Sequence, residues 1–224
     1  MKECVFDIET AGYEWDSIDE GIKDILIDKF DSIENAKMQL GLNPLISKII
    51  VISMLDISSR KIYTFMEPVE RNLFEGDSQK ELDGDYEIII RTGDERTILE
   101  YFCEEITKYK KYITFNGRHF DIPFIIYRSM YHRLKPTRKL MTNRYYADTH
   151  FDIYDMLTFY GAAYGHSLEM WCRTMGITNP KEQGISGANV GKYYREGRIK
   201  EIAQYCNRDV IATAQLYDRI KDYF

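Results

Sequence analysis

The chain has 224 residues, of which 44% are hydrophobic, and a formal net charge of −6. That supplies apolar material for one large domain or two small ones, and the sequence has no low-complexity tract or internal repeat. No apolar run approaches the roughly 18 residues that span a bilayer, and the start shows no basic-then-apolar signal segment. We therefore expect a soluble, intracellular protein in the cytoplasm, without a membrane association. Four scattered cysteines without a CxxC pair argue against a zinc site or a disulfide framework.

Charge is unevenly distributed along the chain. Residues 14–34 and 67–87 each hold eight acids and two bases, whereas no acid lies between Asp121 and Asp148. A solvated basic face is the commoner explanation for such a run, but cations interleaved with tyrosines are also typical of single-stranded nucleic-acid grooves. The residues are Arg128, Arg133, Lys135, Arg138, Lys139 and Arg144, with Tyr127, Tyr131, Tyr145 and Tyr146.

The chain begins with a predicted strand over residues 3–10, ECVFDIET, which is rich in strand-forming residues. Apolar residues at helical spacing then predict one helix over about 17–40. Ser17 and Glu20 resemble a capping box at its start, and glycine and proline follow its end.

The remaining segments alternate between strand and helix patterns, with a polar acidic loop before about Asp85. They are a hairpin over 45–57 and 61–67, strands over 86–91 and 111–117, a helix capped at Thr92 and Glu95, a helix from Asp121, and helices over 152–160, 167–176 and 198–223. This order predicts an α/β fold, a mixed sheet with helices packed on it. We expect one domain over 1–224, with a helical insert at about 14–43.

Two carboxylates interrupt the first apolar strand. Asp7 and Glu9 are two residues apart, so their side chains project to the same side. Close carboxylates repel and raise each other's pKa, and a divalent cation such as Mg²⁺ resolves that conflict. An edge strand whose acids face water is the alternative.

Further candidates lie far along the chain. Asp121 follows a predicted strand at the start of a helix, where it could equally serve as an N-cap. Tyr205 and Asp209 are four residues apart and share one face of the last helix, which by itself fits a surface contact as well.

Three motifs, FDIET, NGRHFD and YCNRD, occur in this order. Together they resemble the motifs of the DEDD superfamily of 3′–5′ exonucleases, and most of all the proofreading exonuclease of family B DNA polymerases and its stand-alone predicted relatives. Gln204 occupies the position of the histidine in one branch, whereas Tyr205 matches the tyrosine of the other. The resemblance implies an RNase H-like mixed central sheet with flanking helices.

The resemblance also implies a chemistry. Asp7, Glu9, Asp121 and Asp209 would hold two divalent ions, Mg²⁺ or Mn²⁺, which together clamp the attacking and leaving oxygens at phosphorus. Tyr205 would orient the attacking water, because a phenol with a pKa near 10 is a poor base at neutral pH. The substrate would be the 3′ end of single-stranded DNA or RNA, with DNA favoured, and the products nucleoside 5′-monophosphates.

Substrate contacts are expected around these motifs. Thr10, Asn116 and Phe120 match positions near the terminal nucleotide, with packing as the alternative. Arg138 and Lys139 are expected to flank the cleft and hold the incoming strand. For the acids at 148, 152 and 155 we expect capping and solvation rather than metal ligation.

Other functions are compatible with the same residues. They are a catalytically silent nucleic-acid-binding module, a 3′–5′ exoribonuclease and a phosphodiesterase for small nucleotides. Proofreading would require a separate polymerase partner, and DNA repair, recombination and RNA trimming are equally open.

Overall fold

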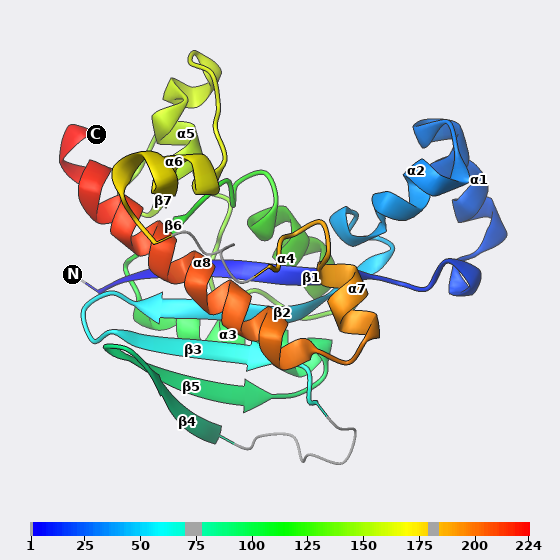
Figure 1. Ribbon diagram of the computed structural model, residues 1–224, viewed down its shortest axis with the longest axis horizontal. Coiled ribbons are helices and arrows are strands. Elements are labelled where there is room, and N and C mark those ends of the chain that lie inside the picture. Colours follow the sequence, from blue (N-terminus) through cyan, green and yellow to red (C-terminus); the bar gives the residue numbers. More distant parts are fainter. Residues whose placement is uncertain (1, 70–77, 179–183) are drawn as a thin grey trace.

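A seven-stranded mixed sheet forms the centre of the computed structural model, which describes residues 2–69, 78–178 and 184–224 (Figure 1). The strand order is β4-β5-β3-β2-β1-β6-β7; β3–β5, β1–β6 and β6–β7 pair in parallel and the other neighbours antiparallel. This confirms the predicted α/β class. The strands are β1 (Glu3–Gly12), β2 (Ser47–Asp56), β3 (Lys61–Met66), β4 (Ser78–Asp83), β5 (Tyr86–Thr92), β6 (Lys111–Thr114) and β7 (His150–Asp152).

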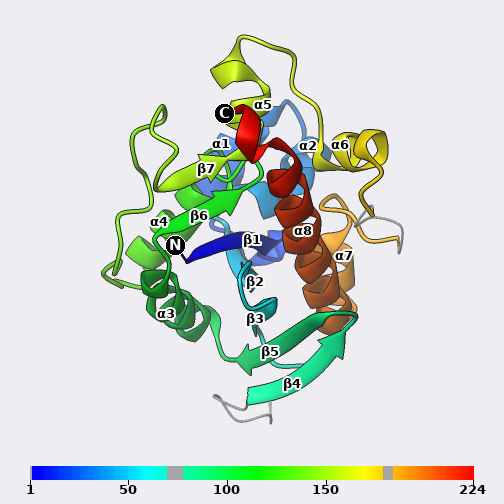
Figure 2. The ribbon, with the colours of Figure 1, turned by 90° about the vertical axis from the view of Figure 1, so that its left-hand side faces the viewer.

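Helices cover both faces of the sheet. The long α8 (Ile199–Ile220) crosses one face, and α3 (Glu95–Glu105) and α4 (Asp121–Tyr131) lie on the other (Figures 1 and 2). None of the described helices combines the length and hydrophobicity of a transmembrane segment. The remaining helices are α1 (Glu20–Phe30), α2 (Ile33–Met38), α5 (Ile153–Leu157), α6 (Leu168–Met175) and α7 (Val190–Arg195), with short 3₁₀ turns η1 (Trp15–Ser17), η2 (Leu40–Leu42), η3 (Ile106–Lys108), η4 (Phe159–Gly161) and η6 (Lys221–Tyr223).

The alternation of β1 decides which side chains face α8. Phe6 and Ile8 pack into the core beneath α3 and α4, whereas Val5 and Ala11 pack on the α8 side. Because strand residues two apart share a face, Asp7 and Glu9 belong to the α8 side. The two acids therefore lie among apolar neighbours on a central strand rather than on an exposed edge.

The insert between β1 and β2 differs from the single helix predicted over 17–40. The chain breaks at Asp31, whose φ of 63° is left-handed, and Ser32 then caps α2 by accepting a hydrogen bond from the Asn35 N–H. The cap of α1 is Asp19, not Ser17. The insert projects from the body of the molecule (Figure 1).

Three other boundaries also differ from prediction. Residues 78–83, expected in an acidic loop, form β4, because pairing with β5 overrides their polar composition; residues 70–77 of that loop lie outside the described residues. Asp94, not Thr92, caps α3. The helix predicted over 152–160 is preceded by β7, which ends at Asp152, so that α5 starts one residue later and is short. The predicted hairpin, the strand at 86–91 and the helices at 167–176 and 198–223 are confirmed within a few residues.

Candidate active site

Asp121 meets β1 where β6 stops. The parallel ladder between β1 and β6 has its last pair at Val5 and Ile113, so the backbone of Ile8 lies beyond the end of β6 and does not pair with that strand. The Ile8 N–H donates instead to Asp121 Oδ1 at 3.1 Å. A carboxylate from the start of α4 thus replaces a missing strand and lies beside Asp7 and Glu9.

The turn of the second motif requires its asparagine and glycine. Asn116 has a left-handed φ of 62°, which asparagine tolerates better than most residues. A Cβ on Gly117 would lie 2.5 Å from the Thr114 Cβ, so only glycine fits there. The turn is held by Asp152, whose carboxylate accepts the N–H groups of Asn116 (3.0 Å) and Arg118 (2.8 Å).

α8 carries the third motif to the same place. Tyr205 hydrogen-bonds to Asp209, one turn later on the helix. Between them, Asn207 Oδ1 accepts hydrogen bonds from Ser53 Oγ at 2.6 Å and Thr64 Oγ1 at 2.8 Å. Because Ser53 and Thr64 belong to β2 and β3, this contact fixes the rotation of α8 against the sheet and with it the direction of the motif.

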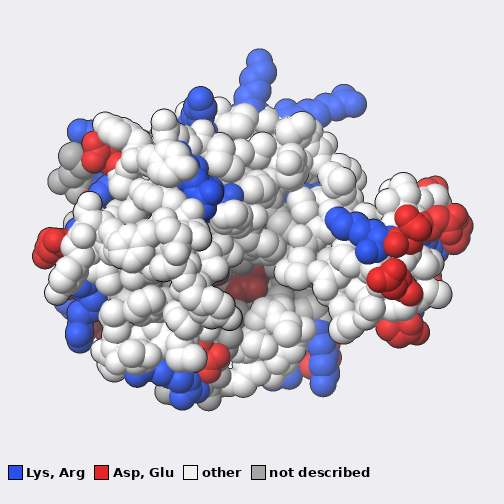
Figure 3. Space-filling view, turned by 90° about the horizontal axis from the view of Figure 1, so that it is seen from above, with Lys and Arg blue, Asp and Glu red and all other residues white. Residues whose placement is uncertain are grey.

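The acids form a buried cluster. Asp7, Glu9 and Cys206 offer ligand atoms that all lie within 4.8 Å of one another. Burial is the largest cause of the raised pKa of Asp7 and Glu9, and the charges of Asp121 and Asp209 raise both further. Burial raises the pKa of Asp121 to about 7. Figure 3 shows a hollow at the centre of one face of the molecule, with acidic side chains on its floor.

The cluster fits divalent metal ions. No basic side chain lowers the pKa of Asp7, Glu9 or Asp121 among the interactions that the structure describes; only hydrogen bonds do so, at Asp7 and Asp121. Buried carboxylates without a cation are costly, and hard carboxylate oxygens are the ligands that Mg²⁺ and Mn²⁺ prefer. Asp7, Glu9, Asp121 and Asp209 are therefore suited to hold such ions, with the Cys206 thiol beside Asp7 Oδ2 at 3.4 Å.

Tyr205 lies against this cluster as a neutral group. Burial raises the pKa of its hydroxyl, and the charges of Asp209, Glu9 and Asp7 raise it further. The hydroxyl therefore keeps its proton at neutral pH and acts as a hydrogen-bond donor, not as a base.

The three predicted nucleotide contacts have structural partners. The Thr10 hydroxyl donates to the carbonyl of Gly41 in the insert. The Phe120 ring packs on Phe124, with ring centroids 5.3 Å apart. Asn116 shapes the turn through its backbone, and whether these residues also contact substrate stays a prediction.

Arg138 and Lys139 lie elsewhere than expected. Both line a pocket built on Phe102 and Ile125, which belong to the core beneath α3 and α4. The Arg138 guanidinium donates to the carbonyls of Tyr109 and Lys110. The expectation that these two residues flank the carboxylates is therefore corrected, because the sheet separates them from Asp7 and Glu9.

The sequence did not predict how Asp152, Asp155 and Asn207 support the site. Asp152 caps α5 as expected, through the Tyr154 N–H at 3.0 Å, but it and Asp155 are each 1% exposed, so solvation is wrong for both. Arg118 and Arg144 neutralise Asp155. Asn207 could have been found from the sequence, because it is a polar residue within the apolar stripe of α8. Nothing in the sequence indicated the role of Asp152 in the turn.

Comparisons with known proteins bear on the fold and on the family of the chain. The search of curated proteins found no match. Among solved structures, the fold is similar to the family B DNA polymerase from the hyperthermophilic archaeon Pyrobaculum calidifontis, with a TM-score of 0.63 and 13% sequence identity over 99% of this chain. The chain spans only 25% of that polymerase chain.

A family model covers most of the chain. It matches residues 47–223 and is described as a predicted 3′–5′ exonuclease related to the exonuclease domain of PolB. The match includes Asp121, Tyr205 and Asp209 but begins after β1, so the assignment of Asp7 and Glu9 to the site rests on the first motif and on the geometry. The chain belongs to this family of predicted 3′–5′ exonucleases related to the exonuclease domain of PolB.

Proposed function

We propose that the protein is a metal-dependent 3′–5′ exonuclease that shortens single-stranded nucleic acid to nucleoside 5′-monophosphates. The observation that carries this proposal is that half-buried Asp7 lies beside buried Glu9 and Asp121, next to Tyr205 and Asp209 on α8, while no basic side chain among the described residues lowers the pKa of any of the three. Such a cluster is stable in its charged form only when cations occupy it. The whole of residues 1–224, insert included, would form the exonuclease domain.

The four acids and Tyr205 have separate roles in this proposal. Asp7, Glu9, Asp121 and Asp209 would hold two ions, Mg²⁺ or Mn²⁺, and such ions would supply activation of a water and stabilisation of the departing 3′ oxygen. Tyr205 would hold the attacking water by accepting a hydrogen bond from it, because the single proton of its hydroxyl is donated to Asp209. The carboxylate of Asp209, which accepts from Tyr205 in this structure, keeps that hydroxyl on the side of the acids.

DNA is the favoured substrate class. One similar solved structure is a DNA polymerase, and the hollow with acidic side chains on its floor offers an approach for a single strand (Figure 3). Thr10, Asn116 and Phe120 border the acids in sequence and are the candidates for contact with the last nucleotide. A role in DNA repair, or beside a separate polymerase in the cytoplasm, is the biological setting we propose.

The test is degradation of 5′-labelled oligonucleotides with Mg²⁺ or Mn²⁺, using matched single-stranded DNA, duplex DNA and RNA. We expect a ladder of shortened products from single-stranded DNA, and no ladder with EDTA or with the Asp7→Ala variant. A retarded band without cleavage would identify a silent binding module instead. A ladder from RNA alone would identify an exoribonuclease.

A further inference from the structure

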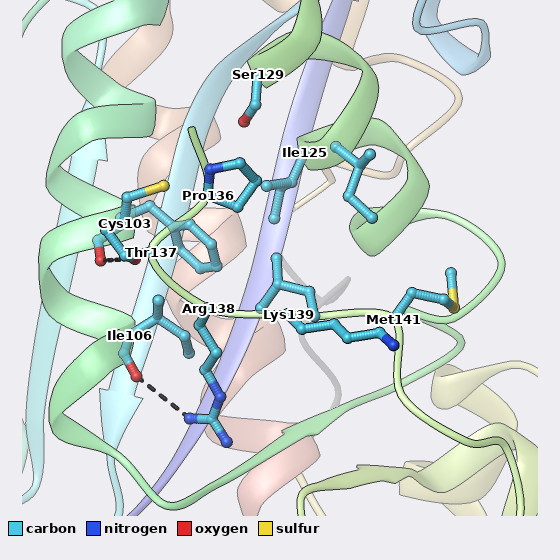
Figure 4. A pocket seen from close by; sticks show the side chains of 12 residues that line it. Cys103, Ile106, Ile125, Ser129, Pro136, Thr137, Arg138, Lys139 and Met141 are labelled. Carbon is cyan, nitrogen blue, oxygen red and sulfur yellow. Dashed lines mark hydrogen bonds between the residues drawn. The ribbon is translucent and has the colours of Figure 1, made fainter. Parts of the chain in front are cut away.

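A pocket lies on the face of the sheet opposite the carboxylates. It has a volume of about 190 Å³ and is bounded by α3, α4 and the segment 136–141 (Figure 4). Its walls include the apolar side chains of Phe102, Ile125, Ile126 and Met141. No step of the proposed reaction uses this pocket.

One buried polar atom of the pocket has no hydrogen-bond partner among the described residues. It is the Oγ of Ser129, a residue that is 1% exposed. Figure 4 shows its side chain pointing from α4 toward the space between Pro136 and Ile125. A buried hydroxyl without a partner is unfavourable, and a bound side chain with a polar atom at its tip, such as tyrosine, would remove that cost by hydrogen-bonding to it.

The rim of the pocket is positively charged. Arg138 is fixed there by the carbonyls of Tyr109 and Lys110, and Lys139 is exposed beside it. Arg133 and Lys135 are exposed just before the lining segment. Within the part of the chain that the structure describes, no ion pair is recorded for Arg133, Lys135 or Lys139, and residues 122–147 contain no acid.

The size and lining of the pocket select the kind of group that fits. A dry cavity of about 150 Å³ holds a benzene molecule, so about 190 Å³ accommodates one aromatic or large aliphatic side chain. A nucleobase carries several donors and acceptors, and a single hydroxyl would leave most of them buried without partners. The cations at the rim favour acidic residues on either side of the inserted side chain.

We propose that this pocket docks an acidic segment of a partner protein through one aromatic or large aliphatic anchor side chain. The anchor fills the space beneath Ser129, and the flanking carboxylates face Lys139 and Arg138. The contact leaves the hollow on the other face open. A partner bound there would bring the protein to its site of action without covering the carboxylates.

A peptide library tests the chemistry of the occupant. Random peptides displayed on phage are selected on the full-length protein and counter-selected on an Ile126→Trp variant, whose added ring fills the pocket. We expect enrichment of peptides in which Asp or Glu flanks an aromatic or large aliphatic residue. Enriched peptides without acids, or peptides that bind the variant equally well, overturn the proposal.

The best peptide is then measured by fluorescence anisotropy. We expect Ile126→Trp and Lys139→Glu each to weaken binding by about tenfold, and Arg195→Glu, the same charge change at an exposed position of α7, to leave it unchanged. Equal losses in the two charge-reversal variants would mean general attraction and would overturn the site. Displacement of the peptide by oligothymidylate at similar concentration would assign the pocket to nucleic acid.

A chemical readout avoids mutation altogether. Cys103 lines the pocket, and it is the one cysteine that is only partly buried, because Cys4, Cys172 and Cys206 are fully buried. Bound peptide should slow alkylation of Cys103 by N-ethylmaleimide at least severalfold, as followed by mass spectrometry. An unchanged alkylation rate overturns the proposal. Self-association in size-exclusion chromatography that Lys139→Glu abolishes also overturns it, because a second copy of the chain would then be the occupant.

Discussion

Two glutamates with nearly the same burial have opposite surroundings. Glu9 is 7% exposed and Glu95 is 6% exposed. Glu95 accepts two hydrogen bonds from Arg128, at 2.8 and 2.7 Å, a third from the Ile49 N–H and contacts His132 Nε2 at 2.7 Å. Burial raises the pKa of Glu9, and the charges of the neighbouring carboxylates of Asp209 and Asp121 raise it further.

The difference separates a structural acid from a functional one. The protein supplies every partner that Glu95 needs, and the same Arg128 reaches the carbonyl of Pro44 and the hydroxyl of Tyr13 at the base of the insert. For Glu9 and Asp7 the described residues supply no cation that lowers the pKa, so the countercharge would come from solution. The exposed fraction does not distinguish Glu9 from Glu95, but the charge of the neighbouring side chains does.

The strongest test of this contrast removes one acid of the cluster. Asp7→Asn should lower the rate of nucleotide release by at least roughly 10³-fold, about 4 kcal/mol of barrier, because one of the four carboxylates that would hold the ions is lost. The unfolding free energy in EDTA should hold or rise, since a repelling charge disappears. Asp56→Asn is the control: that acid is also buried but is bound by Ser58 and Ser59. A similar loss of activity in the control would contradict the contrast.

The reverse pattern is expected for the paired acid. Glu95→Gln should lower the unfolding free energy by roughly 3–5 kcal/mol, because it leaves the buried Arg128 uncompensated. Denaturant titration measures this, and the folded fraction should keep its turnover. Glu100→Gln on the same helix removes only an exposed pair with Arg96 and should change stability by less than about 1 kcal/mol. Equal effects of the two variants would mean that the buried network is not stabilising.

The cluster also predicts how stability depends on pH without metal. The pKa of Asp121 is raised from 3.8 to about 7, so the folded state keeps a proton that the unfolded chain releases. Stability from this group is therefore full below about pH 4 and is lost as pH rises through 7, a change of roughly 2–4 kcal/mol.

Thermal unfolding in EDTA across this range should show the decline, with a flatter profile for Asp121→Asn. Mn²⁺ added at neutral pH should restore the lost stability to the unmodified protein, because cations take the place of the protons. Parallel profiles for the protein and the variant would rule out Asp121 as the source.

The smallest effect is expected at the tyrosine. Tyr205→Phe removes the hydroxyl but keeps the ring, so the turnover rate should fall roughly tenfold, about 1.4 kcal/mol, with Mn²⁺ affinity unchanged by calorimetry. A loss as large as that of Asp7→Asn would make Tyr205 part of the metal-binding set instead of a group that holds water.

The sequence alone predicted those parts of the site that depend on the geometry of a single strand or helix. The alternation of β1 placed Asp7 and Glu9 together, and the helical spacing of Tyr205 and Asp209 set them on one face of α8. The predicted element boundaries were wrong where the sequence pattern does not determine them. The left-handed backbone of Asp31 divides the predicted helix of the insert, and β4 forms because it pairs with β5.

The supporting contacts were beyond any single-sequence pattern. The hydrogen bond of Ile8 to Asp121 joins residues 113 apart, and that of Ser53 to Asn207 joins residues 154 apart. The position of Arg138 and Lys139 relative to the carboxylates was predicted wrongly for the same reason. Charge along the chain reports a cationic segment, but only the topology reveals which side of a sheet receives it.

The early end of β6 gives this molecule a natural spectroscopic probe. Because the Ile8 amide donates directly to the Asp121 carboxylate, its proton resonance reports the charge on that oxygen. Titration with cations or acid would move this one backbone signal, so occupancy of the centre can be followed by nuclear magnetic resonance in the unmodified chain, without a label on any reacting group and without turnover.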